Sequence, residues 1–405
     1  MKKAVAVMVL LSVFLSVTSA TASRTRVNAL GNVNLYVKDD ANISLFPSAV
    51  TRYPNLVNLE SSSYYPGYGE TRYGPIEGGI LLDLGRTGVF GFFINRFPQD
   101  VPYGPDVDPY FESEVDSKLD LFYGKSLEGL DLGLNFYWLG RSREEQDADP
   151  EDEEYKKSLS VLGWQVGMGK RLAKGDVEGT IWYETTDFTD EEDGETLKEP
   201  EGYRSIGIRG RVFQQITEGF TLVPFGEYVN IGRGYTSDIS ESNIELDYKY
   251  TNLTGGFGFN LAPQKHLLVI LHVGVALSKQ EWKYSDISED IGQYRSEYDS
   301  KYTDFPFYGF GIEAELAHWL TARFGARKLV QSMEHEYRNL YETEWERREQ
   351  KGSQAPGQMY LGAGFSFRDW VFDVQVAESF LHYGPNFLSG YDDRIFSRVS
   401  VTRRF

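Results

Sequence analysis

Apolar and polar residues alternate along most of the chain after residue 54. Between residues 266 and 283, one row is apolar (Leu267, Val269, Leu271, Val273, Val275, Leu277) and the other holds His272, Gly274, Ala276, Ser278 and Gln280. Successive residues of a strand point to opposite faces, so this pattern predicts strands with one apolar and one polar side. We expect sixteen such strands, over 55–64, 75–84, 87–96, 117–125, 130–140, 157–171, 176–187, 202–213, 219–234, 246–261, 266–283, 305–317, 321–337, 355–367, 370–382 and 393–405.

Short and long connections alternate between these strands along the chain. The short ones lie near 85–86, 127–129, 173–175, 217–218, 263–264, 318–319 and 368–369, and the long ones near 65–74, 97–116, 141–156, 188–201, 235–245, 284–304, 338–354 and 383–392. Outer-membrane barrels combine short periplasmic turns with long extracellular loops. The predicted fold is therefore all-β, a transmembrane antiparallel up-and-down barrel of about sixteen strands, with fourteen as the alternative count.

The last predicted strand, Arg394–Phe405, has the same two faces. Ile395, Val399 and Val401 are expected to face lipid, while Arg398 and Arg404 point inward. The alternating strand and its terminal aromatic residue resemble the closing strand of bacterial outer-membrane barrels. That resemblance implies that Phe405 is an assembly signal for the barrel assembly machinery.

The first 22 residues have the order of a secretory signal peptide. Lys2 and Lys3 precede an apolar run over residues 4–17, and Ala20-Thr21-Ala22 follows as a cleavage site. The run is shorter than the roughly 20 residues of a transmembrane helix. The chain has no cysteine, so no disulfide framework supports a small-domain fold. We expect export, cleavage before Ser23, and a final location in the cell outer membrane.

Residues 23–54 lack strand alternation and precede the barrel, residues 55–405, as a segment of their own. The segment contains Leu30-Gly31, Asp39-Asp40-Ala41-Asn42 and Phe46-Pro47-Ser48-Ala49. This order resembles the N-terminal segment of the long-chain fatty acid outer-membrane transporter family, although Phe46 stands where that family has Asn. The resemblance implies a plug or periplasmic lid carried by Asp39, Asp40, Asn42 and Pro47, and a fourteen-stranded barrel. An irregular leader into the first strand is the alternative.

Charge and composition exclude one class of partner. The chain has 60 acidic and 41 basic residues and a formal net charge of −19, whereas nucleic acid requires a basic surface. Two stretches, 144–154 and 187–195, are strongly acidic. Carboxylate clusters bind calcium, which would bridge lipopolysaccharide or the loops themselves, but without fixed ligand spacing a solvated loop is the better interpretation.

Charged residues also occur on the faces predicted to point into the lumen. Those residues either bias which solutes pass or neutralise one another inside a filled barrel. A three-residue turn over 318–320 would set Glu315 opposite Arg323, a favourable cross-strand pair. The lumen-facing candidates are Arg209, Arg211, His272, Glu313, Glu315, Arg323, Arg327, Asp373 and Arg398.

Catalysis has little support in the sequence. The five histidines are not part of a G-x-S-x-G or H-E-x-x-H motif, and we expect no enzyme, no cofactor and no metal site. Residues 334–350 carry aromatic side chains at helical spacing, which predicts either a short surface helix or a strand extension over the mouth.

The leading functional prediction is a channel for passive transport of small solutes, including hydrophobic ones if the N-terminal resemblance is meaningful. A non-conducting scaffold for surface-protein assembly or secretion, and a surface adhesin or receptor, are the alternatives. The expected partners are outer-membrane lipid and lipopolysaccharide, the barrel assembly machinery and an unidentified solute.

Overall fold

The structure is a computed structural model that describes ten stretches of the chain: 23–64, 72–96, 117–146, 154–192, 195–200, 203–239, 242–288, 292–341, 344–377 and 395–405. The predicted signal peptide, residues 147–153 of the first acidic stretch and residues 193–194 of the second lie outside these residues. Among the described residues, no helix is long and apolar enough to cross a membrane.

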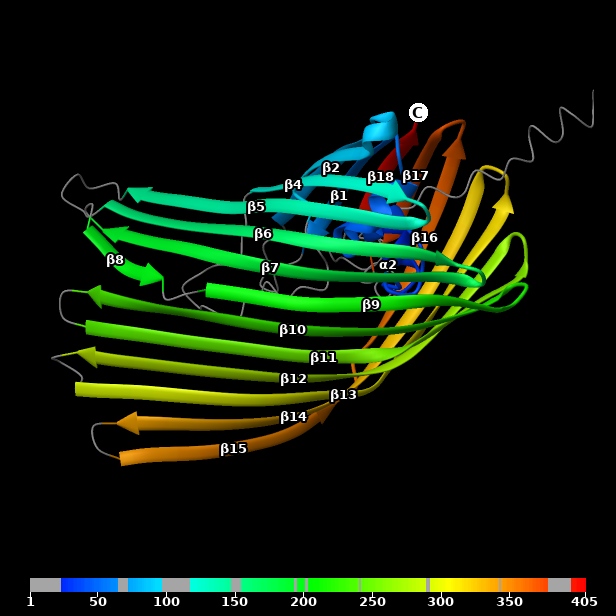
Figure 1. Ribbon diagram of the computed structural model, residues 1–405. Helices are drawn as coiled ribbons and strands as arrows, with labels where there is room; N and C mark the ends of the chain where they lie inside the picture. The colour runs from blue at the N-terminus through cyan, green and yellow to red at the C-terminus, as the bar shows by residue number, and fades with distance from the viewer. Residues whose placement is uncertain are drawn as a thin grey trace, which may run out of the picture.

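Every strand pairs in antiparallel order with its neighbours, and β1 pairs with both β2 and β18, so the sheet closes on itself (Figure 1). The first half of the sheet consists of β1 (Leu56–Tyr64), β2 (Arg72–Asp83), β3 (Val89–Ile94), β4 (Ser117–Leu127), β5 (Leu130–Gln146), β6 (Glu154–Leu172), β7 (Gly175–Glu192), β8 (Glu195–Pro200) and β9 (Tyr203–Thr217). The second half consists of β10 (Phe220–Ile239), β11 (Ser242–Gln264), β12 (Leu267–Ser288), β13 (Gly292–Ala317), β14 (Leu320–Tyr341), β15 (Glu344–Gln354), β16 (Gly357–Phe367), β17 (Trp370–Val376) and β18 (Phe396–Arg404).

The 18 strand segments form the sixteen strands of the barrel wall. β8 and β9 both lie between β7 and β10, and β15 and β16 both pair with β14, so each couple is one interrupted strand. The predicted count of sixteen is confirmed. The fourteen strands implied by the family resemblance are wrong for this chain.

The outer face of the barrel is apolar over a limited height. Leu271, Val273 and Leu277 on β12 are 38 to 46% exposed on that face. From Leu267 to Leu277 the row covers about 23 Å along the barrel axis, at ~3.3 Å per residue and a tilt of ~45°, close to the ~25 Å apolar band of membrane barrels. Trp319 and Trp370 lie exposed beside short turns, where interfacial aromatic residues are enriched.

Above this band the strands continue through stretches that we expected to be loops. The predicted loop over 284–304 consists mostly of the ends of β12 and β13, and the stretch 334–350 is part of a β14–β15 hairpin instead of a surface helix. The outer face there is charged, with ion pairs such as Lys351 to Glu334 at 2.8 Å. Both faces are polar above the lipid, so the hydrophobic alternation ends although the hydrogen-bonded ladder does not.

The turn between β13 and β14 has two residues instead of the three considered from the sequence. Ala317 pairs with Leu320, which places Glu313 opposite Arg323 and Glu315 opposite Thr321. The predicted Glu315–Arg323 pair is therefore wrong by one position on that face, because the shorter turn and a register irregularity between Glu315 and Ala317 each shift the pairing by one residue.

Residues 23–54, called here the N-terminal segment, lie inside the barrel at the end that carries the short turns (Figure 1). The segment forms α2 (Arg24–Ala29) and two 3-10 helices, η1 (Asp40–Ser44) and η2 (Pro47–Arg52); a third, η3 (Gly85–Thr87), connects β2 and β3. α2 packs against β14 and β16–β18, and η2 packs against β3–β6. The segment therefore contacts opposite parts of the wall.

Candidate functional site

The wall is shaped to receive the backbone of the N-terminal segment. A Cβ atom added to Gly133 on β5 would lie 2.2 Å from the carbonyl of Pro47, and one added to Gly325 on β14 would lie 2.3 Å from the carbonyl carbon of Leu30. Real Cβ atoms do not approach other atoms so closely, so only glycine fits at these two positions. The close approach of backbone to backbone is one of the roles that glycine serves inside strands.

An ion-pair chain joins α2 to the wall on the β13–β17 side. Arg26 donates to the two oxygens of Glu313 at 2.6 and 2.7 Å and to Asp39 at 2.7 Å. Arg323 donates to Glu313 at 2.7 Å and to Asp373 at 2.6 Å. Bidentate arginine–carboxylate contacts are the strong form of charged hydrogen bond, and here the bidentate contact, from Arg26 to Glu313, joins the segment to the wall.

A second chain joins the segment to β7 and β9. Glu178 accepts from Arg211 at 2.7 Å and also from Arg52. Arg211 donates further to the carbonyl oxygen of Asn34 and to Asn42 Oδ1, both at 2.8 Å, and its guanidinium lies 4.2 Å from the centre of the Phe46 ring. Phe46, the position that departs from the family pattern, therefore stacks on a luminal arginine.

A third group of charges lies near the seam between β1 and β18. Arg24 donates to Glu77 at 2.6 Å, and Arg398 donates to Glu60 at 3.1 Å. Thr25 Oγ1 donates to the same Glu60 oxygen at 2.8 Å. Five of the nine lumen-facing candidates, namely Arg211, Glu313, Arg323, Asp373 and Arg398, thus lie in ion-pair groups that include the segment.

The four residues of the proposed plug motif each have a defined place. Asp39 caps η1 by accepting from the Ala41 N–H at 2.9 Å, the Asp40 carbonyl oxygen accepts from Arg96 at 2.7 Å, and Pro47 lies against Gly133. Asn42 is the residue that Arg211 binds. Burial raises the pKa of the Asp40 carboxyl well above its usual range, and the neighbouring Asp39 carboxylate adds to the rise.

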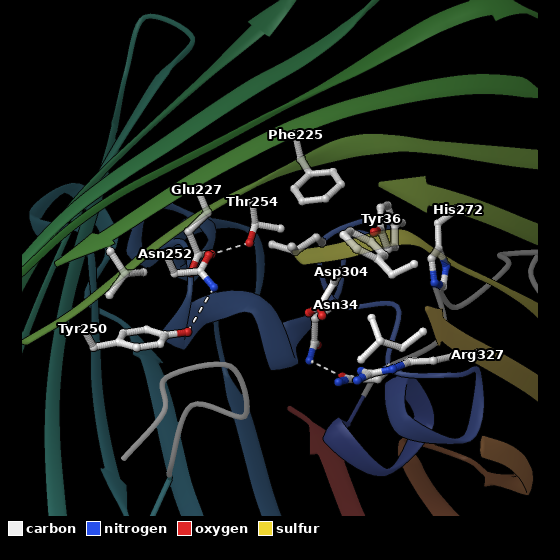
Figure 2. Close-up of a pocket in the computed structure, with 15 residues that line it drawn as sticks. Asn34, Tyr36, Phe225, Glu227, Tyr250, Asn252, Thr254, His272, Asp304 and Arg327 are labelled. Atoms are coloured by element: carbon white, nitrogen blue, oxygen red, sulfur yellow. Dashed lines mark hydrogen bonds between the residues drawn. The ribbon is translucent and has the colours of Figure 1, made fainter. Parts of the chain in front are cut away.

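A cavity of about 290 Å³ lies in the lumen directly on the N-terminal segment (Figure 2). Its floor includes Asn32 and Tyr36 of the segment, and its walls come from β10–β14. We call it the luminal pocket; its lining residues are Asn32, Asn34, Leu35, Tyr36, Phe225, Glu227, Val229, Tyr250, Asn252, Thr254, His272, Asp304, Phe307, Arg327 and Leu329.

The luminal pocket combines flat apolar surfaces with hydrogen-bonding groups. The Tyr36 ring stacks on the His272 ring, with centroids 4.6 Å apart and planes 6° apart, as Figure 2 shows. His272 is 6% exposed, and its Nδ1 is buried with no hydrogen-bond partner among the described residues. Asp304 accepts from Gln331 at 2.9 Å, and Arg327 completes the polar side. A buried nitrogen without a partner is costly, so it favours a ligand that supplies one.

A second cavity, of about 680 Å³, opens at the short-turn end of the barrel. Leu268, Glu313 and Thr321 contribute to its lining, together with Glu315 and His266. Glu315 lies 2.8 Å from His266 Nδ1, in an exposed pair at the rim. We call this space the lower cavity.

The remaining predicted residues do not line either cavity themselves. The Arg209 guanidinium lies 4.4 Å from the centre of the Trp182 ring and 3.5 Å from Glu227. Phe405 donates its backbone N–H to the Asn55 carbonyl oxygen at 2.9 Å, and its ring is exposed. The geometry brings His272 and Arg327 together in the luminal pocket, away from Glu315, Arg398 and Phe405.

Sequence reasoning missed several residues of the luminal pocket. The alternation places Asp304 in a loop and does not distinguish Glu227 from its neighbours, and Tyr36 belongs to a segment without periodicity. The inward positions of β10 and β11 were available from the alternation. The contribution of Tyr36 was not, because no periodicity describes the segment.

No family model matches the chain, and no curated protein matches it. Among solved structures, the ferric yersiniabactin uptake receptor FyuA from Yersinia pestis aligns with 64% of this chain at 8% identity and a TM-score of 0.47. The chain spans 44% of the length of that receptor. A mutant of the TodX monoaromatic hydrocarbon channel aligns with 94% of this chain and 98% of its own, at 10% identity and a TM-score of 0.44. The function proposed below rests on the geometry of the lumen instead.

Proposed function

We propose that the protein is an outer-membrane channel that admits small solutes and is held closed by its N-terminal segment, which acts as a plug. The observation that carries the proposal is a pair of cavities, one lying on that segment and one at the short-turn end of the wall that binds it. The luminal pocket lies on Asn32–Tyr36, and the lower cavity begins at Glu313, the wall carboxylate that holds Arg26.

The size of the luminal pocket sets the size of the solute. About 290 Å³ is at the small end of ligand-binding cavities. Passage requires the segment to shift, since its backbone touches glycines of the wall at Gly133 and Gly325. The proposed solutes are therefore small molecules that enter from the side of the long strands.

The proposed location follows from the outer face and the chain ends. The apolar band requires lipid around it, the first 22 residues have the order of a cleaved signal peptide, and the closing strand ends on Phe405. We propose assembly through the barrel assembly machinery, in contact with lipopolysaccharide above the apolar band.

The experiment that tests the channel is single-channel recording in planar bilayers with Arg26→Ala. This change removes the link from α2 to Glu313 and Asp39, and we expect the purified variant to open more often than the wild-type chain. Glu313→Gln, which keeps the side-chain size, is the second variant. The matched control is Arg338→Ala, which removes an arginine paired with Glu336 at 2.7 Å on the outer face of the barrel and leaves the current unchanged.

A non-conducting scaffold is the second candidate function. It is favoured by the number of buried charges that tie the segment to the wall, because each broken buried pair costs several kcal/mol. Heat-modifiable migration in gels shows whether each preparation holds a folded barrel. If neither Arg26→Ala nor Glu313→Gln conducts in folded preparations, the result favours the scaffold and overturns the channel.

A further inference from the structure

We infer that solutes cross the closed region along the β12–β14 wall, past an apolar constriction at Ile270, and that this constriction selects small uncharged solutes with an apolar body. The inference rests on the proposed channel and adds its route and its selectivity.

The route is defined by three successive inward residues of β12. His272 lines the luminal pocket and Leu268 lines the lower cavity. Ile270, 0% exposed, is the one inward residue of the strand between them. Four residues of strand span about 13 Å, and along β12 one inward side chain, Ile270, lies between the residues that line the two cavities.

The neighbouring strands follow the same order. On β13, Phe307 lines the luminal pocket and Glu313 lines the lower cavity; on β14, Arg327 and Thr321 do the same. Between these pairs the inward positions include Gly311 and Gly325, which carry no side chain and lie against the backbone of Leu30 and Gly31 in the N-terminal segment. The wall therefore contributes little bulk to the barrier apart from Ile270 and Arg323.

The segment fills the barrier with apolar side chains. Ile270 belongs to one buried cluster with Val27, Leu30, Val33, Tyr36, Val37, Ala41 and Phe225. Hydrophobic constrictions in channels block ions because water leaves them. An uncharged solute loses little on entering such a constriction, whereas an ion loses its hydration shell.

The luminal pocket just above the constriction has matching chemistry. Tyr36 and His272 offer a stacked aromatic surface, and the unpartnered His272 Nδ1 offers one hydrogen bond to a polar group of the solute. A solute that places an apolar face on these rings and one neutral polar edge toward His272 has only to pass Ile270 to reach the lower cavity.

The test compares Ile270→Ser with Leu81→Ser. Leu81 is also 0% exposed, but it belongs to the cluster on the other side of the segment, with Phe46, Ile43 and Phe93. We expect Ile270→Ser to hydrate the constriction and raise the ionic current on the order of tenfold, with no change for Leu81→Ser. Ile270→Trp should reduce the swelling rate of proteoliposomes in small uncharged solutes such as phenol or benzyl alcohol to the background of lipid alone.

Each other outcome overturns a defined statement. Current in both serine variants would mean that any loosening of the segment opens the barrel, and the constriction is not at Ile270. If neither serine variant conducts but Arg26→Ala does, the solute route lies elsewhere and the proposal of a channel still holds. If Arg26→Ala is silent as well, the channel itself fails. Heat-modifiable gel migration establishes that each variant is folded before it is scored.

Discussion

The N-terminal segment meets the barrel wall in two different ways. Around η2, backbone lies against Gly133, and a closely packed cluster with Phe46 and Phe93 surrounds the contact. Around Leu30, the backbone lies as close to Gly325, but the luminal pocket begins two residues further along the segment, at Asn32, and the lower cavity reaches Glu313 on the neighbouring strand. The same segment is thus enclosed on the β3–β6 side, which we call the anchor, and bordered by free space on the β12–β14 side, which we call the gate.

This difference indicates that filling the lumen and closing it have different structural requirements. The anchor needs tight packing over a large area, because it must hold the segment in the barrel. In the proposed channel, the gate needs only a thin barrier with room beside it, because it must move.

Removal of Glu178 should damage the anchor most. Glu178→Ala leaves Arg52 and Arg211 buried without their shared carboxylate, and breaking a buried pair costs about 3 to 5 kcal/mol. Chemical denaturation in detergent should show this loss in the free energy of unfolding. Glu178→Gln keeps the shape and should lose less; equal losses would mean that packing, not charge, makes the contact.

Equivalent glycine substitutions should separate the anchor from the gate. Gly133→Ala forces the Pro47 backbone to move inside a packed cluster and should cost about 1 to 3 kcal/mol. Gly325→Ala should cost less, because the luminal pocket begins at Asn32, next to Gly31, and leaves the segment room to shift. Gly226→Ala on β10 is the control, since the nearest atom to its added Cβ is 3.9 Å away. An equal loss at Gly133 and Gly325 would contradict the distinction between the two sides.

The pH dependence of the closed state should reflect Asp40. The pKa of Asp40 is raised in the folded chain, so its neutral form is favoured there. The stabilisation that this proton binding gives the folded chain is fully present below the ordinary Asp pKa of about 3.9. That contribution is lost as the pH rises from there through the raised pKa. Thermal unfolding across this range should therefore show a stability that falls less with pH in Asp40→Asn than in the wild-type chain. Parallel curves would contradict the assignment.

The rim pair at the mouth of the lower cavity should matter least. His266 and Glu315 are exposed at 67 and 42% of their side chains, and exposed pairs contribute less than about 1 kcal/mol. His266→Ala should leave both the free energy of unfolding and the current unchanged. A clear change in current would extend the gate down to the rim.

The barrel could be predicted from the sequence because its rule is local. The alternation along β12 and the short turns depend on neighbouring residues alone, and they gave sixteen strands in the correct order. The alternation does not predict the upper ends of β12 and β13 as strands, because their outer face is charged above the lipid. The pairing of Glu313 depends on the length of a turn and on a register irregularity beside it, which the alternation does not determine.

The sites inside the lumen were harder to predict. Parity identified Arg211, Glu313 and Asp373 as inward residues, but their partners come from a segment without periodicity. Arg26, Arg52 and Tyr36 gave no repeating signal, so nothing in the sequence connected Tyr36 with His272, 236 positions away along the chain. Long-range contacts of an irregular segment require the three-dimensional structure.

The seam between β1 and β18 has a consequence for the order of assembly. Because the first strand pairs with the last, the ring stays open until the whole chain is present, while the segment comes before the first strand. The partners of η2 on β3–β6 are synthesised early, and those of α2 on β14 and β16–β18 arrive last. We expect the segment to dock first on the early strands and to be enclosed when the late strands join, so that the barrel closes around its own contents.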